Sequence, residues 1–339
     1  MSRSDDLRRR LNALNRQPLG ESDERPPAAE PSEASETDEL RRRIRKKLRT
    51  RGGGAPSGAP ERAKPSPEPI VLRRDVARRE PPKAPPLPAA GPHVTLEEAV
   101  VGVEATARDG GVAYVVERRV GAASADRLAL RGALAGVLED RRSGLWRQLD
   151  YLGIEGPLRP EGLMFLDLET TGLGSSPLFL IGAMVCDEDG LLVRQFFARD
   201  YSEERAALAL FLPLAAPRRL LVTFNGKSFD VPFLRARAAA NAMPCDLDPP
   251  HLDLLHAGRR IWKRCLPDCR LQTLERHVCG RLRHDDIPGA FIPDAYHDFV
   301  RTGNAARMVT VLEHNFLDLV TLADLIVRMP AGPPSGGGG

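Results

Sequence analysis

The sequence predicts an α/β domain with a mixed sheet, and three observations predict it. Apolar runs of strand length come first, at residues 163–168, 178–185 and 191–198. A fourth run follows at 219–224. From residue 202 onward, segments with helical spacing are interleaved with it or follow it. Strands first and helices later indicate an α/β fold whose site gathers at strand ends.

Local signals fix the order of elements in this domain. The acidic turn at 187–190 joins the second and third strands. A helix is expected over 202–214, with Glu203 and Glu204 in its first turn, where the helix dipole favours anions. The turn Asn225-Gly226 ends the fourth strand. Further helices are expected at 230–241, 252–263, 271–279, 294–301 and 304–329.

Residues 93–160 are expected to form an ordered extension that precedes the main domain, residues 161–330. The sequence predicts a helical patch at 96–101, a strand at 112–120 and a helix around 128–138, followed by a linker. This segment is too small for a good core of its own. We therefore expect it to pack on the main domain.

Residues 1–92 are expected to be a disordered Pro/Arg-rich tail. They hold 15 of the 30 prolines and no Phe, Trp or Tyr, so they bury too little apolar area to offset the entropy of ordering. Their 21 basic and 14 acidic residues give a net charge of +7, whereas 28 and 32 give −4 for the remainder. The run 41–51, with eight basic residues, is either a solvated tail or an electrostatic tether for nucleic acid. A flexible tail is also expected at 331–339.

The chain carries no secretory or membrane signal that we recognise. Its first residues lack an apolar h-region, and no apolar run approaches the roughly 18 residues that span a bilayer. We therefore expect a cytoplasmic location and no membrane partner. The five cysteines are expected as reduced thiols. Cys265, Cys269, His277 and Cys279 lie close in sequence but lack a paired C-x2-C, which favours buried thiols over a zinc or iron–sulfur site.

Carboxylates stand at three places where the predicted domain should form its site. Asp167 and Glu169 end the strand at 163–168, and side chains two apart on a strand share a face. Two like charges so placed suit a hard divalent ion such as Mg²⁺ or Mn²⁺. Asp230 follows the fourth strand, and alone it fits a helix N-cap. Asp318 lies in the last helix on the same face as His314, and an unpaired carboxylate buried there would be costly.

These acids belong to three sequence motifs, and the motifs, in this order, resemble those of a known family. Asp167-x-Glu169-Thr-Thr-Gly-Leu, then Phe224-Asn-Gly-Lys-Ser-Phe-Asp230, then His314-Asn-x-x-Asp318 resemble the exonuclease motifs of the DEDD class in the ribonuclease H-like superfamily. Within it the chain is most similar to the YprB-like predicted exonucleases, over about residues 93–329. That family's pattern also includes segments like those starting at His251, Trp262 and Asp285. The resemblance implies a ribonuclease H-like, mixed five-stranded sheet flanked by helices.

The resemblance also implies an activity, namely metal-dependent hydrolysis of phosphodiester bonds by a 3′→5′ exonuclease. Asp167, Glu169, Asp230 and Asp318 would bind two Mg²⁺ or Mn²⁺ ions, which clamp an in-line displacement at phosphorus. His314 would be the general base. It precedes Asp318 by four residues, however, whereas histidine-type members have five and tyrosine-type members four. His314 would thus act from the tyrosine location, or hydrogen-bond to the metal ligands, or simply be a helix-face His satisfied by a carboxylate.

Six substrate contacts are implied as well: Thr170, Thr171, Leu173, Asn225, Lys227 and Phe229. The two threonines would hold the terminal sugar, and Lys227 would meet a phosphate. Leu173 and Phe229 would wedge or stack against bases, with ordinary core packing as the alternative. Asp253 is either a fifth acid near the site or an N-cap of the next helix, and it is left out of the metal set.

The expected partner is nucleic acid, DNA or RNA, at single strands or 3′ ends. The alternative function is a catalytically weak or inactive nucleic-acid-binding module with the same fold, for which the displaced His314 and the basic tail leave room. Metal-dependent chemistry on small nucleotides is a third possibility, although it gives the basic tail no purpose. Loss of any of the four acids would have favoured binding alone, and none is missing.

Overall fold

The computed structural model describes residues 91–329 except 122, 123, 173, 175 and 284. These residues all belong to one compact unit. The tail expected over 1–92, apart from its last two residues, and the tail expected at 331–339 lie outside the described residues.

Within the described residues, seven strands form one mixed sheet in the order β1-β2-β5-β4-β3-β6-β7. Strands β3, β6 and β7 run parallel to one another, and the other neighbours pair antiparallel. The predicted α/β class with a mixed sheet is therefore confirmed. The strands are β1 Val103–Thr106, β2 Val112–Arg119, β3 Leu163–Thr170, β4 Leu178–Asp187, β5 Gly190–Phe197, β6 Leu220–Thr223 and β7 His251–Asp253.

The predicted number of five strands is too low for the sheet in the described residues. Strands β5-β4-β3-β6-β7 supply five, and β1 and β2 from the segment before residue 160 extend the sheet. β2 pairs along β5, with Val115 opposite Phe196. A strand edge left unpaired is unfavourable, so the predicted strand at 112–120 pairs with the sheet of the main domain.

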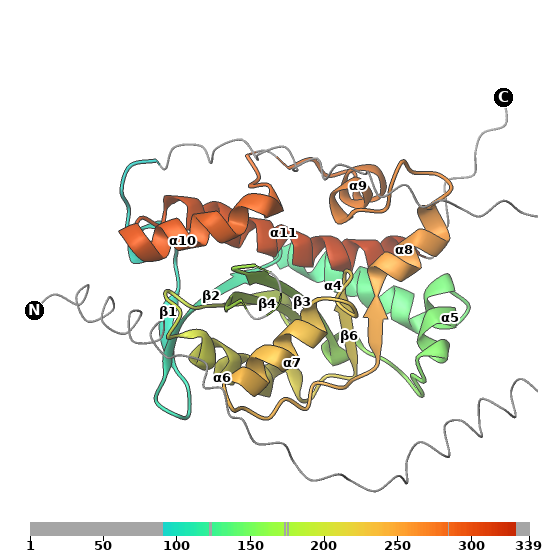
Figure 1. Ribbon diagram of the computed structural model, residues 1–339. Coiled ribbons are helices and arrows are strands. Elements are labelled where there is room, and N and C mark those ends of the chain that lie inside the picture. Colours follow the sequence, from blue (N-terminus) through green and yellow to red (C-terminus); the bar gives the residue numbers. More distant parts are fainter. Residues whose placement is uncertain (1–90, 122–123, 173, 175, 284, 330–339) are drawn as a thin grey trace, which may run out of the picture. The chain divides into compact units, whose positions relative to one another are not determined.

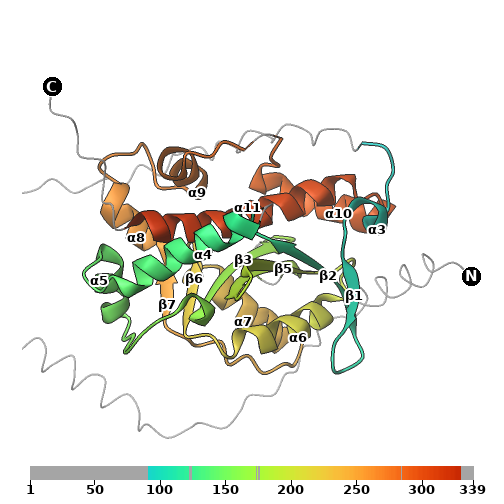
Figure 2. The same ribbon diagram turned by 180° about the vertical axis from the view of Figure 1, so that it is seen from behind.

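Helices cover both faces of the sheet (Figures 1 and 2). Helices α4, α10 and α11 lie on one face, and α6 and α7 lie on the other. The helices and helical turns are α3 Leu96–Ala99, α4 Ser124–Glu139, α5 Gly144–Tyr151, η1 Pro160–Gly162, α6 Glu204–Ala215, α7 Asp230–Ala240, α8 Leu254–Trp262, α9 Leu271–Leu274, η2 Glu275–Cys279, η3 Gly289–Phe291, α10 Ile292–Thr302 and α11 Ala306–Arg328. None of the described helices has both the length and the apolar character needed to cross a membrane.

Three local expectations differ from the structure. The segment expected as a linker before Leu163 contains helix α5 and the 3₁₀ turn η1. The helix expected from residue 252 begins two residues later, because residues 251–253 pair with β6 as β7. The helix expected over 271–279 is α-helical only through α9 and continues as the π-helical turn η2.

Strand β3 sets the geometry of the site, because it lies between β4 and β6 and alternates its side chains between the two helical layers. Leu163 and Phe165 pack in the cluster that includes α11 residues, whereas Met164 and Leu166 pack in the cluster that includes α6 and α7. The same alternation puts residues 167 and 169 on the α11 face.

Candidate active site

Asp167 and Glu169 stand near the end of β3 on the face covered by α11. Asp167 Oδ2 accepts a hydrogen bond from Asn315 Nδ2 at 2.8 Å. No described residue donates a hydrogen bond to the Glu169 carboxylate. Burial, and next the charges of Asp318, Glu169 and Asp230, raise the pKa of Asp167 well above its usual range. Burial raises the pKa of Glu169 to about 8.

Asp230 is the first residue of α7, and its side chain reaches back to β3. Its Oδ1 accepts the Leu168 N–H at 3.2 Å, so it meets the strand between the two acids of β3. The residue is 4% exposed, and burial raises the pKa of its carboxyl to about 7. Phe229, not Asp230, occupies the N-cap position of α7. The N-cap alternative for Asp230 is therefore wrong.

Asp318 completes the group from the middle of α11. Its Oδ2 lies 3.5 Å from His314 Nε2, and its Oδ1 pairs with Arg283. Burial raises the pKa of Asp318, while His314 and Arg283 lower it in part. The structure thus brings all four predicted acids into one group, which we call the carboxylate cluster: Asp167, Glu169, Asp230 and Asp318.

The donor set of the carboxylate cluster fits divalent cations. Besides burial, the charge of Asp318 raises the pKa of the other three carboxylates, and in the described residues only Asp318 of this cluster has an arginine partner. Oxygen donors gathered in this way are the ligands that Mg²⁺ and Mn²⁺ prefer. In the arrangement that the structure describes for residues 91–329, however, no group of three or more His, Cys, Asp or Glu side chains is placed so that it could hold a metal ion. The assignment of metal ligands stays a prediction.

His314 lies beside the cluster and is held by a second carboxylate. Its Nδ1 is 2.7 Å from Asp286 Oδ1. In the neutral imidazole, an Nδ1–H that donates to Asp286 leaves Nε2 unprotonated, and Nε2 faces Asp318. Burial lowers the pKa of His314, but the Asp286 hydrogen bond and the nearby acids outweigh it, so the pKa is raised. The four-residue spacing in α11 therefore still points an imidazole nitrogen at the cluster.

Arg283 is a cation that the sequence analysis did not identify. Its side chain is 6% exposed, and its Nε donates to Glu275 Oε2 at 2.6 Å. Its Nη1 lies 3.4 Å from Asp286 Oδ2, and its Nη2 pairs with Asp318. Arg283 thus lies between two carboxylates and bonds to both. One is Asp286, which holds His314, and the other is Asp318, a predicted metal ligand. The family-like segment starting at Asp285 was the available sequence signal for Asp286, whereas no spacing pattern marks Arg283 or Glu275.

Asn315 is a second residue whose role was missed. It is fully buried, and its Oδ1 accepts from Gln195 Nε2 at 2.9 Å while its Nδ2 donates to Asp167. Gln195 also donates to the Leu312 carbonyl at 2.7 Å. A Cβ on Gly182 of β4 would lie 2.1 Å from Asn315 Oδ1. The glycine is therefore needed for Asn315 to reach Asp167 across the sheet.

The predicted substrate contacts near β3 have structural partners of their own. Thr170 Oγ1 donates to the Gly172 carbonyl at 2.8 Å, and Thr171 Oγ1 donates to the Pro177 carbonyl at 3.1 Å. Both hydroxyls therefore hold the turn after β3. Leu173 lies outside the described residues. Contacts with a substrate stay a prediction at these positions.

The β6–α7 loop carries the remaining predicted contacts. Asn225 and Lys227 are exposed, and Asn225 adopts a left-handed φ of 65°. Phe229 is half-buried and packs against Phe233 at a ring-centroid distance of 5.4 Å, which agrees with the core alternative. Asp253 caps α8 and accepts backbone N–H groups from Asn225, Leu255 and Lys227 at 2.8, 3.0 and 3.2 Å. The N-cap alternative for Asp253 is thus the observed one.

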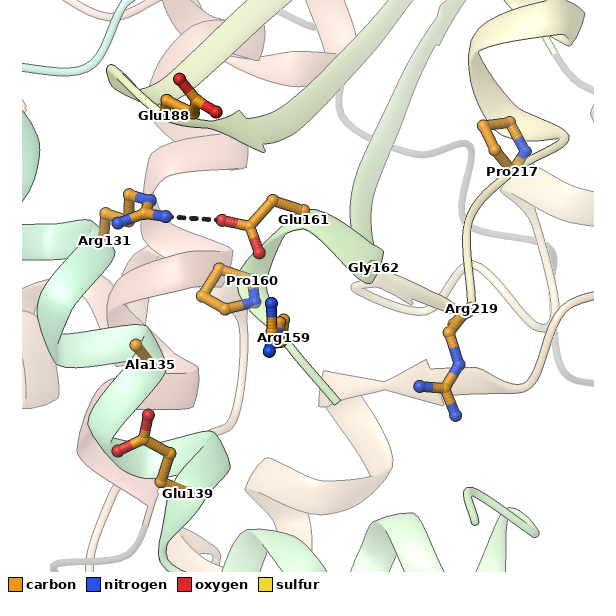
Figure 3. Close-up of a pocket in the computed structure, with 10 residues that line it drawn as sticks. All are labelled: Arg131, Ala135, Glu139, Arg159, Pro160, Glu161, Gly162, Glu188, Pro217 and Arg219. Carbon is orange, nitrogen blue, oxygen red and sulfur yellow. Dashed lines mark hydrogen bonds and ion pairs between the residues drawn. The ribbon is translucent and has the colours of Figure 1, made fainter. Parts of the chain in front are cut away.

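A separate hollow of about 750 Å³ lies at the opposite end of β3, beside η1 (Figure 3). Three arginines and three glutamates line it, and Arg131 pairs with Glu161 at 2.8 Å. The glycine before Leu163 forms part of its wall, so the hollow is at the start of the strand whose end bears Asp167 and Glu169. Its balanced charges and its place set it apart from the carboxylate cluster.

Comparisons with known proteins bear on this geometry. A family model described as the RNase_H superfamily matches residues 164–329. A curated protein of Bacillus subtilis (strain 168), "Uncharacterized protein YprB", is 33% identical over 195 residues, which are 55% of this chain and 46% of that protein. The match thus spans about half the length of that relative. A solved family B DNA polymerase from the hyperthermophilic archaeon Pyrobaculum calidifontis is 18% identical, with a TM-score of 0.41 over 51% of this chain and 25% of that chain.

Proposed function

Because the chain belongs to a YprB-like family with a ribonuclease H-like fold, we propose that it is a metal-dependent nuclease, a DEDD-type 3′→5′ exonuclease. The superfamily match supports nuclease activity in general. The finer assignment depends on one observation, the convergence of Asp167, Glu169, Asp230 and Asp318 from β3, α7 and α11. Two-metal hydrolysis of a phosphodiester bond would account for four acids that lie far apart in the sequence and meet in the fold.

Two divalent ions, Mg²⁺ or Mn²⁺, held by these four carboxylates would lower the pKa of an attacking water and stabilise the leaving oxygen. Other residues of the chain hold these carboxylates in place. Asn315 fixes the Asp167 carboxylate, and the Leu168 N–H fixes that of Asp230. Both are attached to packed elements, so the donors are preorganised before a ligand arrives.

His314 is proposed as the group that takes the proton of the attacking water. In the neutral tautomer whose Nδ1–H donates to Asp286, Nε2 carries the lone pair toward the cluster. Asp286 would then stabilise the protonated imidazole, as a carboxylate does for a catalytic histidine. This makes Asp286 a positioning residue that acts through His314.

One observation favours the alternative of a binding module with weak or no turnover. Arg283 already pairs with Asp318, and a carboxylate engaged with an arginine is less available to a metal ion. The cleavage assay below distinguishes the two functions, because a binding module would retain nucleic acid without shortening it.

The direct test uses the full chain with single-stranded DNA and RNA labelled at the 5′ or the 3′ end, with Mg²⁺ or Mn²⁺. We expect a ladder from the 5′ label and early release of a labelled mononucleotide from the 3′ label. Asp167→Asn, Asp230→Asn and Asp318→Asn should each reduce cleavage by roughly 100-fold or more, since each removes charge that stabilises the transition state. The exposed Asp246→Asn serves as a matched control.

Cleavage that persists in EDTA, or that survives all three cluster substitutions, would disprove the metal-dependent nuclease. Stable binding without shortening of either labelled strand would instead favour the binding module.

A further inference from the structure

We propose that the surface between α5, α8 and the β6–α7 loop binds a single strand of nucleic acid, with Tyr151 as a stacking platform for a base and Lys227 and Arg260 as phosphate contacts. This inference rests on the proposed function, because it places the strand next to the carboxylate cluster. Lys227 was predicted as a contact from the sequence. Arg260 belongs to a basic helix segment, with Arg259, Lys263 and Arg264, that the sequence offers either as a guide for a strand or as a solvated face, and Tyr151 was not identified.

Tyr151 is displayed on the surface by a firmly anchored helix. Its side chain is at the end of α5 and the residue is 85% exposed. Leu145, Trp146 and Leu149 of the same helix are at most 1% exposed. An aromatic ring usually gains from burial, so a ring held out from a fixed support is available for a ligand.

The surroundings of Tyr151 carry positive charge. Tyr151, Lys227, His256 and Arg260 share the lining of a small hollow of about 70 Å³. Lys227 and Arg260 are exposed. The acid in this lining, Asp253, is 3% exposed and is occupied by backbone N–H groups. The accessible charged side chains in this lining are therefore basic.

Helix α5 contacts helix α8, and residues of both helices line the hollow. Arg260 Nη1 of α8 donates to Gln148 Oε1 of α5 at 2.7 Å, and the two helices lie side by side in both ribbon views (Figures 1 and 2). This hydrogen bond uses one guanidinium nitrogen of Arg260 and holds its side chain near Tyr151. Its other nitrogens have no partner among the described residues, and they remain free for an anion.

Two residues of this lining, Lys227 and Asp253, connect the surface to the carboxylate cluster. Lys227 belongs to the loop that leads into α7, three residues before Asp230. Asp253, which fixes the Lys227 backbone, is close enough to Asp230 for their charges to interact. A strand whose end lies at the cluster would therefore have Lys227 and then Tyr151 along one path.

The chemistry of this surface selects an unpaired strand. A base can stack on an exposed ring only when it is not paired and stacked inside a duplex, and basic side chains then follow the backbone. Helix α5 precedes residues 164–329, which match the superfamily model. The stacking platform is thus an addition made by the extension before the nuclease domain.

The test measures binding of the full chain to fluorescently labelled single strands by anisotropy in EDTA, so that cleavage does not interfere. About 0.15 M salt limits the contribution of distant basic residues. We expect Tyr151→Ala to weaken binding by about 5- to 150-fold and Tyr151→Phe to retain it, for DNA and RNA strands measured separately. Binding of a blunt duplex should not change with Tyr151→Ala.

A second pair of variants tests the phosphate contact. Arg260→Gln should weaken binding and reduce the slope of log affinity against log salt by about 1. Arg264→Gln removes the same charge at an exposed position outside the hollow and should leave the slope closer to that of the wild type. Equal effects of the two variants would indicate general attraction and overturn the assignment of Arg260.

Wild-type affinity in Tyr151→Ala, or no single-strand binding by the wild type in EDTA, would overturn the proposal. These results are separable from those for the nuclease. Unchanged binding in Tyr151→Ala together with metal-dependent cleavage would refute this surface and leave the nuclease standing. Weakened binding in Tyr151→Ala without cleavage under any metal would support the surface and refute the nuclease.

Discussion

At the residue scale, a buried polar chain fixes the first acid of the site. Gln195 of β5 donates to Asn315 of α11, and Asn315 donates to Asp167 of β3. Gln195 and Asn315 are almost fully buried, and such groups are retained only when their hydrogen bonds are made. Gly182 leaves the space through which this chain passes.

Gly182→Ala tests this arrangement. The new Cβ would meet Asn315 Oδ1 at 2.1 Å, so either the sheet or the Asn315 side chain must move. We expect a loss of about 1–3 kcal/mol in the free energy of unfolding, measured by urea denaturation. Gly132→Ala in α4 is the matched control, since a Cβ there meets nothing within 4 Å, and it should gain about 0.5–1 kcal/mol. A Gly182→Ala protein as stable as the wild type would contradict the proposed close approach.

Arg283→Gln tests competition between a resident cation and a metal ion. Removing a positive charge that pairs with Asp318 should tighten Mn²⁺ binding by an order of magnitude, about 1.4 kcal/mol, as measured by calorimetry on the folded protein. Arg283→Lys keeps the charge and should stay near the wild type. Weaker Mn²⁺ binding in Arg283→Gln would show that the arginine supports the site instead of competing for it.

Three acids of the carboxylate cluster could be located from sequence patterns, whereas Asp230 alone fits a helix N-cap and was included through the family resemblance. Asp167 and Glu169 end an apolar strand, and Asp318 interrupts an apolar helix face. Arg283 could not be identified, because it lies beyond the π-helical turn, where no periodicity predicts which way a side chain points. Its partners Glu275 and Asp286 are brought to it only by the tertiary fold.

At the element scale, the β6–α7 loop is held by the start of the next strand–helix unit. Asp253 ends β7, caps α8 and accepts two N–H groups from that loop. The loop begins with the left-handed Asn225, a conformation that costs energy for most residues other than glycine. One buried carboxylate thus fixes the loop that precedes Asp230.

Asp253→Ala should therefore destabilise the protein more than loss of a surface acid does. Three backbone N–H groups lose their acceptor, and we expect a cost of about 2 kcal/mol or more in chemical denaturation. Asp246→Ala removes an exposed acid nearby and should change stability by no more than about 0.5 kcal/mol. Similar costs for the two variants would show that the loop does not depend on Asp253.

Predictions of elements succeeded where apolar runs were long. Strands β3, β4 and β5 and helix α11 were located from their patterns, with ends differing by a few residues. β7 has three residues, too few for an alternating pattern, and its parallel pairing with β6 determines it. Helix α5 spans eight residues, and the burial of its apolar face against the rest of the domain supports it more than local propensity does.

At the scale of the whole molecule, charge is divided along the sequence. Residues 1–92 carry +7 and the remainder −4. A basic segment attached to a domain whose site is acidic can raise the local concentration of a polyanion without contacting the reacting phosphate. How this segment is placed lies outside the described residues.

Deletion of residues 1–90 should weaken oligonucleotide binding at low salt more than at high salt. Each basic residue that meets a phosphate adds to the salt dependence, so the slope of log affinity against log salt should become shallower in the deleted protein. Anisotropy titrations at several salt concentrations measure this slope. An unchanged slope would mean that the basic segment is only a solvated tail.

The carboxylate cluster itself is tested most directly by anomalous X-ray scattering from crystals grown with manganese. The proposal that these four acids bind the catalytic ions predicts anomalous peaks between Asp167, Glu169, Asp230 and Asp318, and loss of those peaks in Asp167→Asn crystals. Manganese bound elsewhere while the four carboxylates stay without an ion would contradict it.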